Sequence, residues 1–269
     1  MKDVLVVDSA TQLGAAARGA VVVCGSHGAL YPSWLAARAR VRAVVLNDAG
    51  IGRHSAGIAG VLWLANLGIA AVAVDYRTAP IGDARGTLET GVVTTVNEVA
   101  ALHGCLPGHT CRQATRCLLE HAVEPRDKDV PEIGESRLRI SNTGHRPVWA
   151  LDSVSLVRAD DRRAVLVTGS HGGLLGGKRD DGILSVDVFA AFFNDAGGGK
   201  DDAGYARLPL LEGRGIAGAT VSCLSARIGD GRSTYDTGVI SRANAVAQRL
   251  DVKEGMTARE AVARLVGLG

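Results

Sequence analysis

Histidine and serine side chains recur in this sequence directly after short apolar runs. The tetrapeptide GSHG occurs twice, and it contains Ser26 and His27 in its first copy and Ser170 and His171 in its second. An imidazole titrates near neutral pH, so a histidine beside a hydroxyl suits general acid–base catalysis. We therefore expect His171 to act as the catalytic acid or base, with Ser170 as nucleophile or hydrogen-bond donor.

Other polar residues complete the predicted site for a small anionic molecule. Asp195 or Asp230 is expected to orient the imidazole, while Arg232 and Lys200 are expected to hold a carboxylate or another anion. Arg232 comes just before an expected helix, whose first N–H groups favour a bound anion. The remaining candidates are the catalytic residues His27 and Cys223 and the binding residues Arg227, Asn194, Gly172, Gly173, Ser26 and Asn47.

The segment after His171 is rich in glycine. From Gly172 to Lys178 it reads GGLLGGK, which formally fits the phosphate-binding pattern GxxxxGK, but Arg179 stands where a magnesium-binding Ser or Thr belongs. Clustered backbone N–H groups bind oxyanions without that motif, so the segment predicts an anion-binding loop. No GxGxxG is followed by an acidic strand end, and we expect neither a dinucleotide cofactor nor a metal.

The two GSHG copies belong to a longer repeat. LNDAGIGRHSAG (46–57) returns as FNDAGGGKDDAG (193–204), and residues 47–118 align with residues 194–265 at a constant offset of 147 without a gap. Roughly thirty of the aligned pairs are identical. Self-similarity over this length indicates an internal duplication.

Each copy alternates short β-branched runs with stretches of helical spacing. The runs AVVVCG, RAVVLND and IAAVAVD are separated by segments such as SAGIAGVLWLANLG. Continuous apolar strands between helices are typical of parallel sheet that is buried on both faces. We predict an α/β fold of two Rossmann-like parallel-sheet units related by a pseudo-two-fold axis. The first repeat is expected at 1–122, a linker at 123–146 and the second repeat at 147–269. The pattern leaves open whether these form one sheet or two.

The repeated polar residues fall at the expected carboxyl ends of strands, where open parallel sheets bind ligands. Structural roles suit the same positions. An Asn-Asp pair such as Asn47-Asp48 caps turns through backbone hydrogen bonds, and Asp230 suits a helix N-cap. Arg232 is also close enough in sequence to pair with Asp236. Both interpretations stay open. The second copy carries more basic and glycine residues, so we expect it to bear most of the chemistry.

His171 and Cys223, which lie 52 residues apart after apolar runs, resemble the histidine and cysteine of caspase-like cysteine proteases. That resemblance implies an imidazole that deprotonates the Cys223 thiol, although an additional apolar run, FAAFFND, intervenes here. The duplicated plan also resembles the aspartate/glutamate racemase superfamily, in which each half supplies a cysteine. In this chain Cys24 and Cys223 occupy non-equivalent positions. A buried, inert Cys223 is the third interpretation.

The length, composition and net charge of the chain restrict the class of protein. The chain has 269 residues, 46% hydrophobic composition and a net charge of +2, with no basic run suited to nucleic acid. No apolar run approaches the roughly eighteen residues of a membrane span. Five cysteines and the absence of a signal-peptide pattern favour reduced thiols in the cytoplasm.

We therefore predict a cytoplasmic hydrolase or lyase acting on a carboxylate-bearing small molecule. The competing hypothesis is a non-catalytic protein that binds small anions at the same edges. A further alternative is a cysteine-dependent hydrolase or a racemase-like isomerase that uses Cys223. A homo-oligomer is compatible with each of these.

Overall fold

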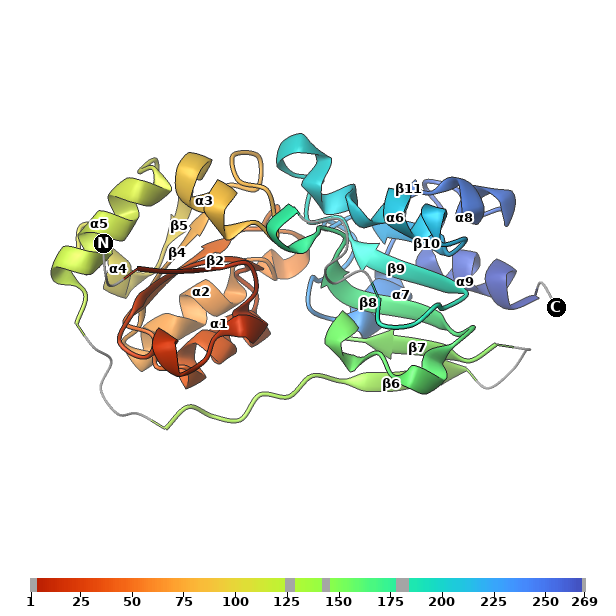
Figure 1. Cartoon of the computed structure of the whole chain (residues 1–269), viewed down its shortest axis with the longest axis horizontal. Helices are drawn as coiled ribbons and strands as arrows, with labels where there is room; N and C mark the ends of the chain where they lie inside the picture. Colours follow the sequence, from red (N-terminus) through yellow and green to blue (C-terminus); the bar gives the residue numbers. More distant parts are fainter. Residues whose placement is uncertain (1–3, 124–128, 142–145, 178–183, 268–269) are drawn as a thin grey trace.

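The chain folds into two adjacent α/β units, each built on its own sheet (Figure 1). The computed structural model describes residues 4–123, 129–141, 146–177 and 184–267. The first sheet has the order β1 (Val4–Val7), β2 (Val21–His27), β3 (Ala43–Asn47), β4 (Ala70–Val74) and β5 (Val93–Val96). The second has the order β11 (Ile240–Ala243), β10 (Ala217–Val221), β9 (Ala190–Asn194), β8 (Val165–His171), β7 (Val148–Leu151) and β6 (Arg137–Ser141). Within the described chain there are thus two sheets.

Most neighbouring strands are parallel, as the continuous apolar runs predict. The exceptions in the described residues are β5 beside β4, β11 beside β10 and β6 beside β7, which are antiparallel. The segment expected as a linker therefore contributes β6 to the second sheet. The α/β class with mostly parallel strands is confirmed.

Helices cover both faces of each sheet. With the first sheet pack α1 (Leu30–Arg38), α2 (Ala59–Trp63), α3 (Ala84–Thr90), α4 (Glu98–Leu102) and α5 (Cys111–His121). With the second pack α6 (Arg207–Gly213), α7 (Gly231–Thr237), α8 (Ala245–Arg249) and α9 (Ala258–Gly267). A side chain on either face of a central strand is therefore buried, which explains why these strands are continuously apolar rather than alternating.

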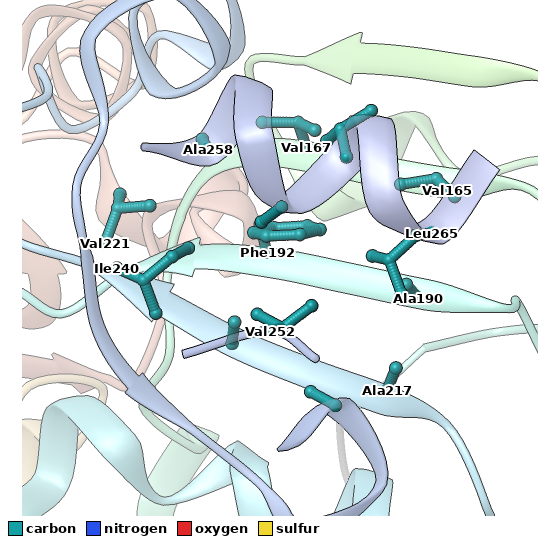
Figure 2. Close-up of a cluster of buried hydrophobic side chains, with 14 of the residues drawn as sticks. Val165, Val167, Ala190, Phe192, Ala217, Val221, Ile240, Val252, Ala258 and Leu265 are labelled. Atoms are coloured by element: carbon teal, nitrogen blue, oxygen red, sulfur yellow. The ribbon is translucent and has the colours of Figure 1, made fainter. Parts of the chain in front are cut away.

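The core of each half is built from Ala, Val and Leu, with phenylalanine added in the second half. In Figure 2, Phe192 of β9 lies between neighbouring strands and helix α9, close to Val167, Ala258 and Leu265. Phe193 faces the opposite side of the sheet, where it packs in a separate cluster with Leu211 of α6. These clusters fix the strands, and the strands carry the polar residues at their carboxyl ends.

The two halves, residues 4–122 and 147–267, share a small apolar core where their strand ends meet. It contains Ala29, Ala49, Ala56, Ile81, Ala196 and Ile228. Backbone hydrogen bonds cross the same junction: Arg53 N donates to the Cys223 carbonyl at 2.7 Å, and Lys200 N donates to the Tyr76 carbonyl at 2.8 Å. The halves are therefore packed together through buried contacts.

The halves differ after β2 and β8, the strands that end in the two histidines. In the first, β2 leads into helix α1; in the second, β8 is followed by a short 3-10 turn, η7 (Leu175–Gly177), and no α-helix in the described residues before β9. No helix in the described ranges is both long and apolar enough to cross a membrane.

Replacing Ile228 with alanine tests the shared core. Ile228 is 5% exposed in the junction cluster, and removing a buried isoleucine side chain costs about 2–5 kcal/mol of unfolding free energy. We expect a loss in this range by urea denaturation. Leu224→Ala is the matched control, since Leu224 is 73% exposed and should cost less than about 0.5 kcal/mol. Equal costs for both variants would contradict a buried junction.

Candidate functional site

A cavity of about 640 Å³ opens where the carboxyl ends of the two sheets meet. Both halves line it, and so does the segment between them. Its polar lining comprises Ser9, Thr11, Ser26, His27, Tyr31, Glu135, Asp152, Ser153, Ser155, Ser170, His171, Ser185, Arg207 and Arg214. Four predicted site residues, Ser26, His27, Ser170 and His171, are thus brought together.

His27 and His171 meet at one wall of this cavity. The rings, from the last residues of β2 and β8, are edge to face with centroids 6.1 Å apart and planes at 85°. Each imidazole also rests against a glycine of the opposite half. A Cβ added to Gly82 would lie 3.4 Å from His171 Cε1, and one added to Gly229 would lie 3.7 Å from His27 Cε1.

The two imidazoles differ in their hydrogen bonds. His171 Nδ1 accepts a hydrogen bond from Gly173 N at 3.1 Å. In a neutral imidazole the accepting nitrogen carries no proton, so His171 holds its proton on Nε2. His27 Nδ1 is buried without a hydrogen-bond partner in the described part of the chain. Its tautomer is therefore not fixed by a backbone amide.

Both histidines are neutral at physiological pH. Each is 8% exposed, and burial lowers the pKa of His27 from 6.5 to about 4. The pKa of His171 lies well below 6.5 because of burial, the nearby Arg207 charge and His27 itself. A neutral imidazole is able to accept a proton at once, as a general base requires.

The hydroxyl groups around the histidines are arranged alike in both halves. Ser26 Oγ accepts a hydrogen bond from Ala10 N, and Ser170 Oγ accepts one from Val154 N, each at 3.0 Å. These bonds tie the strand ends to the loops that follow β1 and β7. The Ser26 hydroxyl also bonds with the Cys24 thiol, whereas the bond from Val154 N leaves the Ser170 hydroxyl proton available for donation. Ser170 therefore suits hydrogen-bond donation at the cavity wall.

Arg207, at the start of α6, is the most deeply buried cation of the cavity. It is 3% exposed, its Nε–H donates to the Gly173 carbonyl at 2.9 Å, and its guanidinium lies 5.2 Å from the Phe193 ring centroid. Burial lowers the pKa of Arg207 to about 10, so it remains charged at neutral pH. Arg207 is not among the site residues predicted from the sequence. The signal that the sequence did offer is a difference between the aligned segments, which have glycine at position 60 and arginine at position 207.

Two carboxylates line another part of the cavity. Glu135 reaches it from the segment between the halves, which Trp34 anchors by donating from Nε1 to the Pro131 carbonyl at 2.8 Å. Asp152 accepts hydrogen bonds from Ser136 N at 2.7 Å and Gly231 N at 3.0 Å. Burial raises the pKa of both carboxyl groups. Neither carboxylate is among the predicted site residues.

The two asparagines predicted as binding residues instead stabilise the turns that follow their strands. Asn47 Oδ1 accepts from Ala49 N at 2.8 Å, and Asn194 Oδ1 accepts from Ala196 N at 2.9 Å. Their Nδ2 groups donate to carbonyls of the following loops. Both residues are completely buried beside the cavity rather than among its lining residues. Gly172 also lies outside the lining, with its N–H donating to the Asn194 carbonyl at 2.9 Å.

Asp195 and Cys223 form a separate pair at the junction. Asp195 Oδ1 accepts from Cys223 N and from Gly197 N, each at 2.9 Å. Burial and the neighbouring Asp195 charge raise the pKa of the Cys223 thiol to about 12. At neutral pH such a thiol is protonated and weakly nucleophilic. Neither residue is among those that line the cavity.

The predicted basic residues lie outside the cavity lining. Arg227 pairs with Asp230 at 2.6 Å, and Arg232 pairs with Asp236 at 2.5 Å. Asp230 also caps α7 by accepting from Ser233 N at 2.7 Å. These contacts match the structural interpretation of the pattern.

Lys200 lies at the junction, where its Nζ donates to Thr90 Oγ1 at 3.0 Å. Lys178, the last residue of the GGLLGGK loop, is outside the described residues. Among the residues that are described, no group of three or more His, Cys, Asp or Glu side chains is arranged to hold a metal ion.

No model of a known protein family matches this chain, and neither a curated protein nor a solved structure matches it significantly. Function is therefore inferred from the site itself.

The buried histidines should make stability depend on pH. Unfolded His27 binds a proton below pH 6.5, whereas the folded residue does so only near 4. Between these values the unfolded state binds more protons, so stability falls as the pH falls. Above pH 6.5 this contribution is constant. We expect wild type to lose on the order of 3 kcal/mol more than His27→Gln between pH 7 and 4. Parallel urea-midpoint curves for the two proteins would contradict the buried, neutral imidazole.

Proposed function

We propose that the cavity is the active site of a hydrolase or lyase that acts on a carboxylate-bearing small molecule, with His27 as its general base and acid and His171 as a hydrogen-bond donor to the substrate. One observation carries this proposal: two buried neutral imidazoles, one from each half, meet edge to face at 6.1 Å on a single cavity wall. Imidazoles in this state are suited to move protons without first losing one to solvent.

The hydrogen bonds favour different roles for the two rings. His171 keeps its proton on Nε2 and donates a hydrogen bond from it to the substrate. His27 has no partner on Nδ1 within the described chain, and it is the base that takes a proton from water or from a substrate carbon. In hydrolysis, water loses a proton to His27 as it attacks, and the imidazolium so formed gives that proton to the leaving group. In elimination, the substrate carbon loses the proton to His27, and the imidazolium returns it to the departing hydroxyl, which leaves as water. Both rings are neutral again at the end.

The charge distribution supports an anionic substrate. The Arg207 charge is close enough to depress the pKa of His171, so it also acts on a ligand at that ring. Ser170 lies beside His171 and supplies a hydroxyl donor. Cys223, with its raised pKa and its position outside the cavity lining, has no role in this proposal.

The proposal includes an internal duplication with a pseudo-two-fold axis near the histidine pair. Support comes from contacts that recur in reciprocal form. Arg53 N bonds to the Cys223 carbonyl, and Lys200 N bonds to the Tyr76 carbonyl, which are equivalent pairs at the sequence offset of 147. The reciprocal packing of each imidazole on the opposite half is a further instance. A site on such an axis receives one histidine from each copy.

Replacing either histidine by glutamine tests the catalytic role. The panel consists of carboxylic acids that bear an ester, an amide or a β-hydroxyl group, and turnover is followed by NMR. We expect turnover by wild type and a fall in kcat of about 10²–10⁴-fold in His27→Gln and in His171→Gln. His121→Gln is the matched control, because His121 is exposed on α5, and it should keep full activity.

Two results would contradict the proposal. Full activity in both cavity variants would remove the histidines from the reaction. Thermal stabilisation by an acid, with no turnover anywhere in the panel, would instead support the alternative of a non-catalytic binding protein.

The pH profile of kcat/KM provides an independent check. The base must be unprotonated, and the pKa of His27 is lowered to about 4. Activity should therefore persist below the ordinary histidine value of 6.5, with its acid limb nearer 4. An acid limb at 6.5 or above would indicate that another group, or an exposed imidazole, acts as the base.

A further inference from the structure

Apolar side chains form a second part of the cavity lining, which the acid–base chemistry of the histidines does not require. Partly exposed aliphatic and aromatic side chains from both halves contribute to it, namely Tyr31, Leu35, Val154, Val157, Leu175 and Leu184. Single exposed apolar residues are common on protein surfaces, whereas several that converge in one hollow are typical of a ligand pocket. We call Tyr31, Leu35, Val154 and Val157 the apolar wall.

The second half supplies Val154 and Val157 from the 3-10 turn η5 (Val154–Leu156) and the residue that follows it. Val157 N donates to the Val154 carbonyl at 3.2 Å. Side chains three residues apart lie on the same side of a 3-10 turn, and both valines line the cavity. Val154 N also donates to Ser170 Oγ at 3.0 Å. This bond places the valine pair beside the strand end that carries His171.

The first half supplies Tyr31 and Leu35 from α1. They are four residues apart and therefore lie on the same face of the helix. The Tyr31 ring is held on two sides, because it stacks on buried Trp34 with centroids 5.2 Å apart and its hydroxyl donates a hydrogen bond to the Glu135 carboxylate. Leu35 packs on a core cluster of the first half. The wall is thus ordered before a ligand binds, which lowers the entropic cost of binding.

The apolar wall lies next to the histidine pair. Ala10 N and Val154 N donate to Oγ of the serines that precede His27 and His171 in the chain. An apolar group on the wall is therefore close to the reacting atoms of the same molecule. The cavity, with about 640 Å³, is in the range of roughly 300–1,000 Å³ found for pockets that bury drug-sized ligands. A ligand of that size contacts both the histidines and the wall.

We propose that the apolar wall binds a hydrocarbon group of the substrate, so that the substrate is an amphipathic carboxylic acid rather than a small polar one. The inference rests on the proposed function for the carboxylate and the reaction, whereas the hydrocarbon contact itself requires neither. Transfer of apolar surface from water to the wall supplies binding free energy. A small molecule suits the wall better than a protein partner does, because the wall lines a hollow rather than a flat surface.

The experiment measures how affinity depends on the length of an unbranched hydrocarbon chain. The probes are butyrate, hexanoate and octanoate, each paired with its primary amide. Dissociation constants at neutral pH are obtained from the Leu35 methyl signals in ¹H–¹³C spectra, since every protein compared contains Leu35. The proteins are wild type, Val157→Thr, the double variant Val154→Thr/Val157→Thr and the matched control Val6→Thr. Val6 is 41% exposed on β1 and is not among the residues that line the cavity.

We expect each lengthening by two methylenes to strengthen binding to wild type about tenfold, for acids and amides alike, because one fully buried methylene provides a gain of about fourfold. Threonine has nearly the shape of valine but places a hydroxyl against the chain. The double variant should therefore bind hexanoate about tenfold more weakly than wild type, and Val157→Thr should show part of that loss. Val6→Thr should bind as wild type does.

Three outcomes would overturn the inference. Affinity for wild type does not rise with chain length, or the rise persists unchanged in both cavity variants, as merely structural valines would allow. In the third, no chain binds while analytical ultracentrifugation shows that two copies associate through the wall and that the double variant stays monomeric.

Failure of the proposed function has a different signature. If affinity rises with chain length and depends on the valines while no ester, amide or β-hydroxy acid is turned over, the wall binds hydrocarbon groups in a protein without catalysis. If substrates are turned over with equal kcat/KM whatever their chain length, the enzyme stands and the hydrocarbon contact is overturned.

Discussion

In each half, the backbone of a glycine-aspartate loop lies directly on the strand that ends in the histidine, β2 or β8, and the arrangement of the site depends on that contact. Gly82 N donates to the Gly25 carbonyl and Gly229 N donates to the Gly169 carbonyl, both at 2.8 Å. A Cβ on either strand glycine would enter the backbone of the loop. Both loop glycines also have positive φ, +85° and +80°, which other residues adopt at a cost. Four glycines thus allow the loops to project their isoleucines into the junction between the halves.

The same contact also affects the burial, and so the protonation state, of the two histidines. Each loop, seated on its own strand, presents its glycine to the imidazole of the opposite half, and each histidine is only 8% exposed. Desolvation then favours the neutral form of each ring. Protonating one ring also disfavours protonating its neighbour 6.1 Å away. Both rings are therefore neutral at physiological pH, the state in which an imidazole is able to accept a proton.

The sequence predicted the part of this site that strands determine. An apolar run that ends in Ser-His must deliver those residues to the edge of the sheet, and Ser26, His27, Ser170 and His171 do line one cavity. Arg232 illustrates what local pattern leaves undecided: a helix start suits a bound anion and an ion pair equally, and here Asp236 is within reach. Glu135 could not be predicted from the sequence for another reason. It lies in the long segment between the two halves, and no periodic pattern in the sequence indicates where such a segment runs.

Gly60 and Arg207, which align at the offset of 147, show how helix packing affects the lining of the cavity. In the first half α1 follows β2, the next helix approaches α1 closely, and only glycine fits at the contact. In the described part of the second half no α-helix follows β8, and the aligned Arg207 lines the cavity. There the Gly173 carbonyl accepts a hydrogen bond from Arg207 Nε, and the Phe193 ring lies 5.2 Å from the guanidinium. The packing of neighbouring helices thus decides that one of the two aligned positions is a glycine in a close helix contact, while the other is a buried arginine at the cavity.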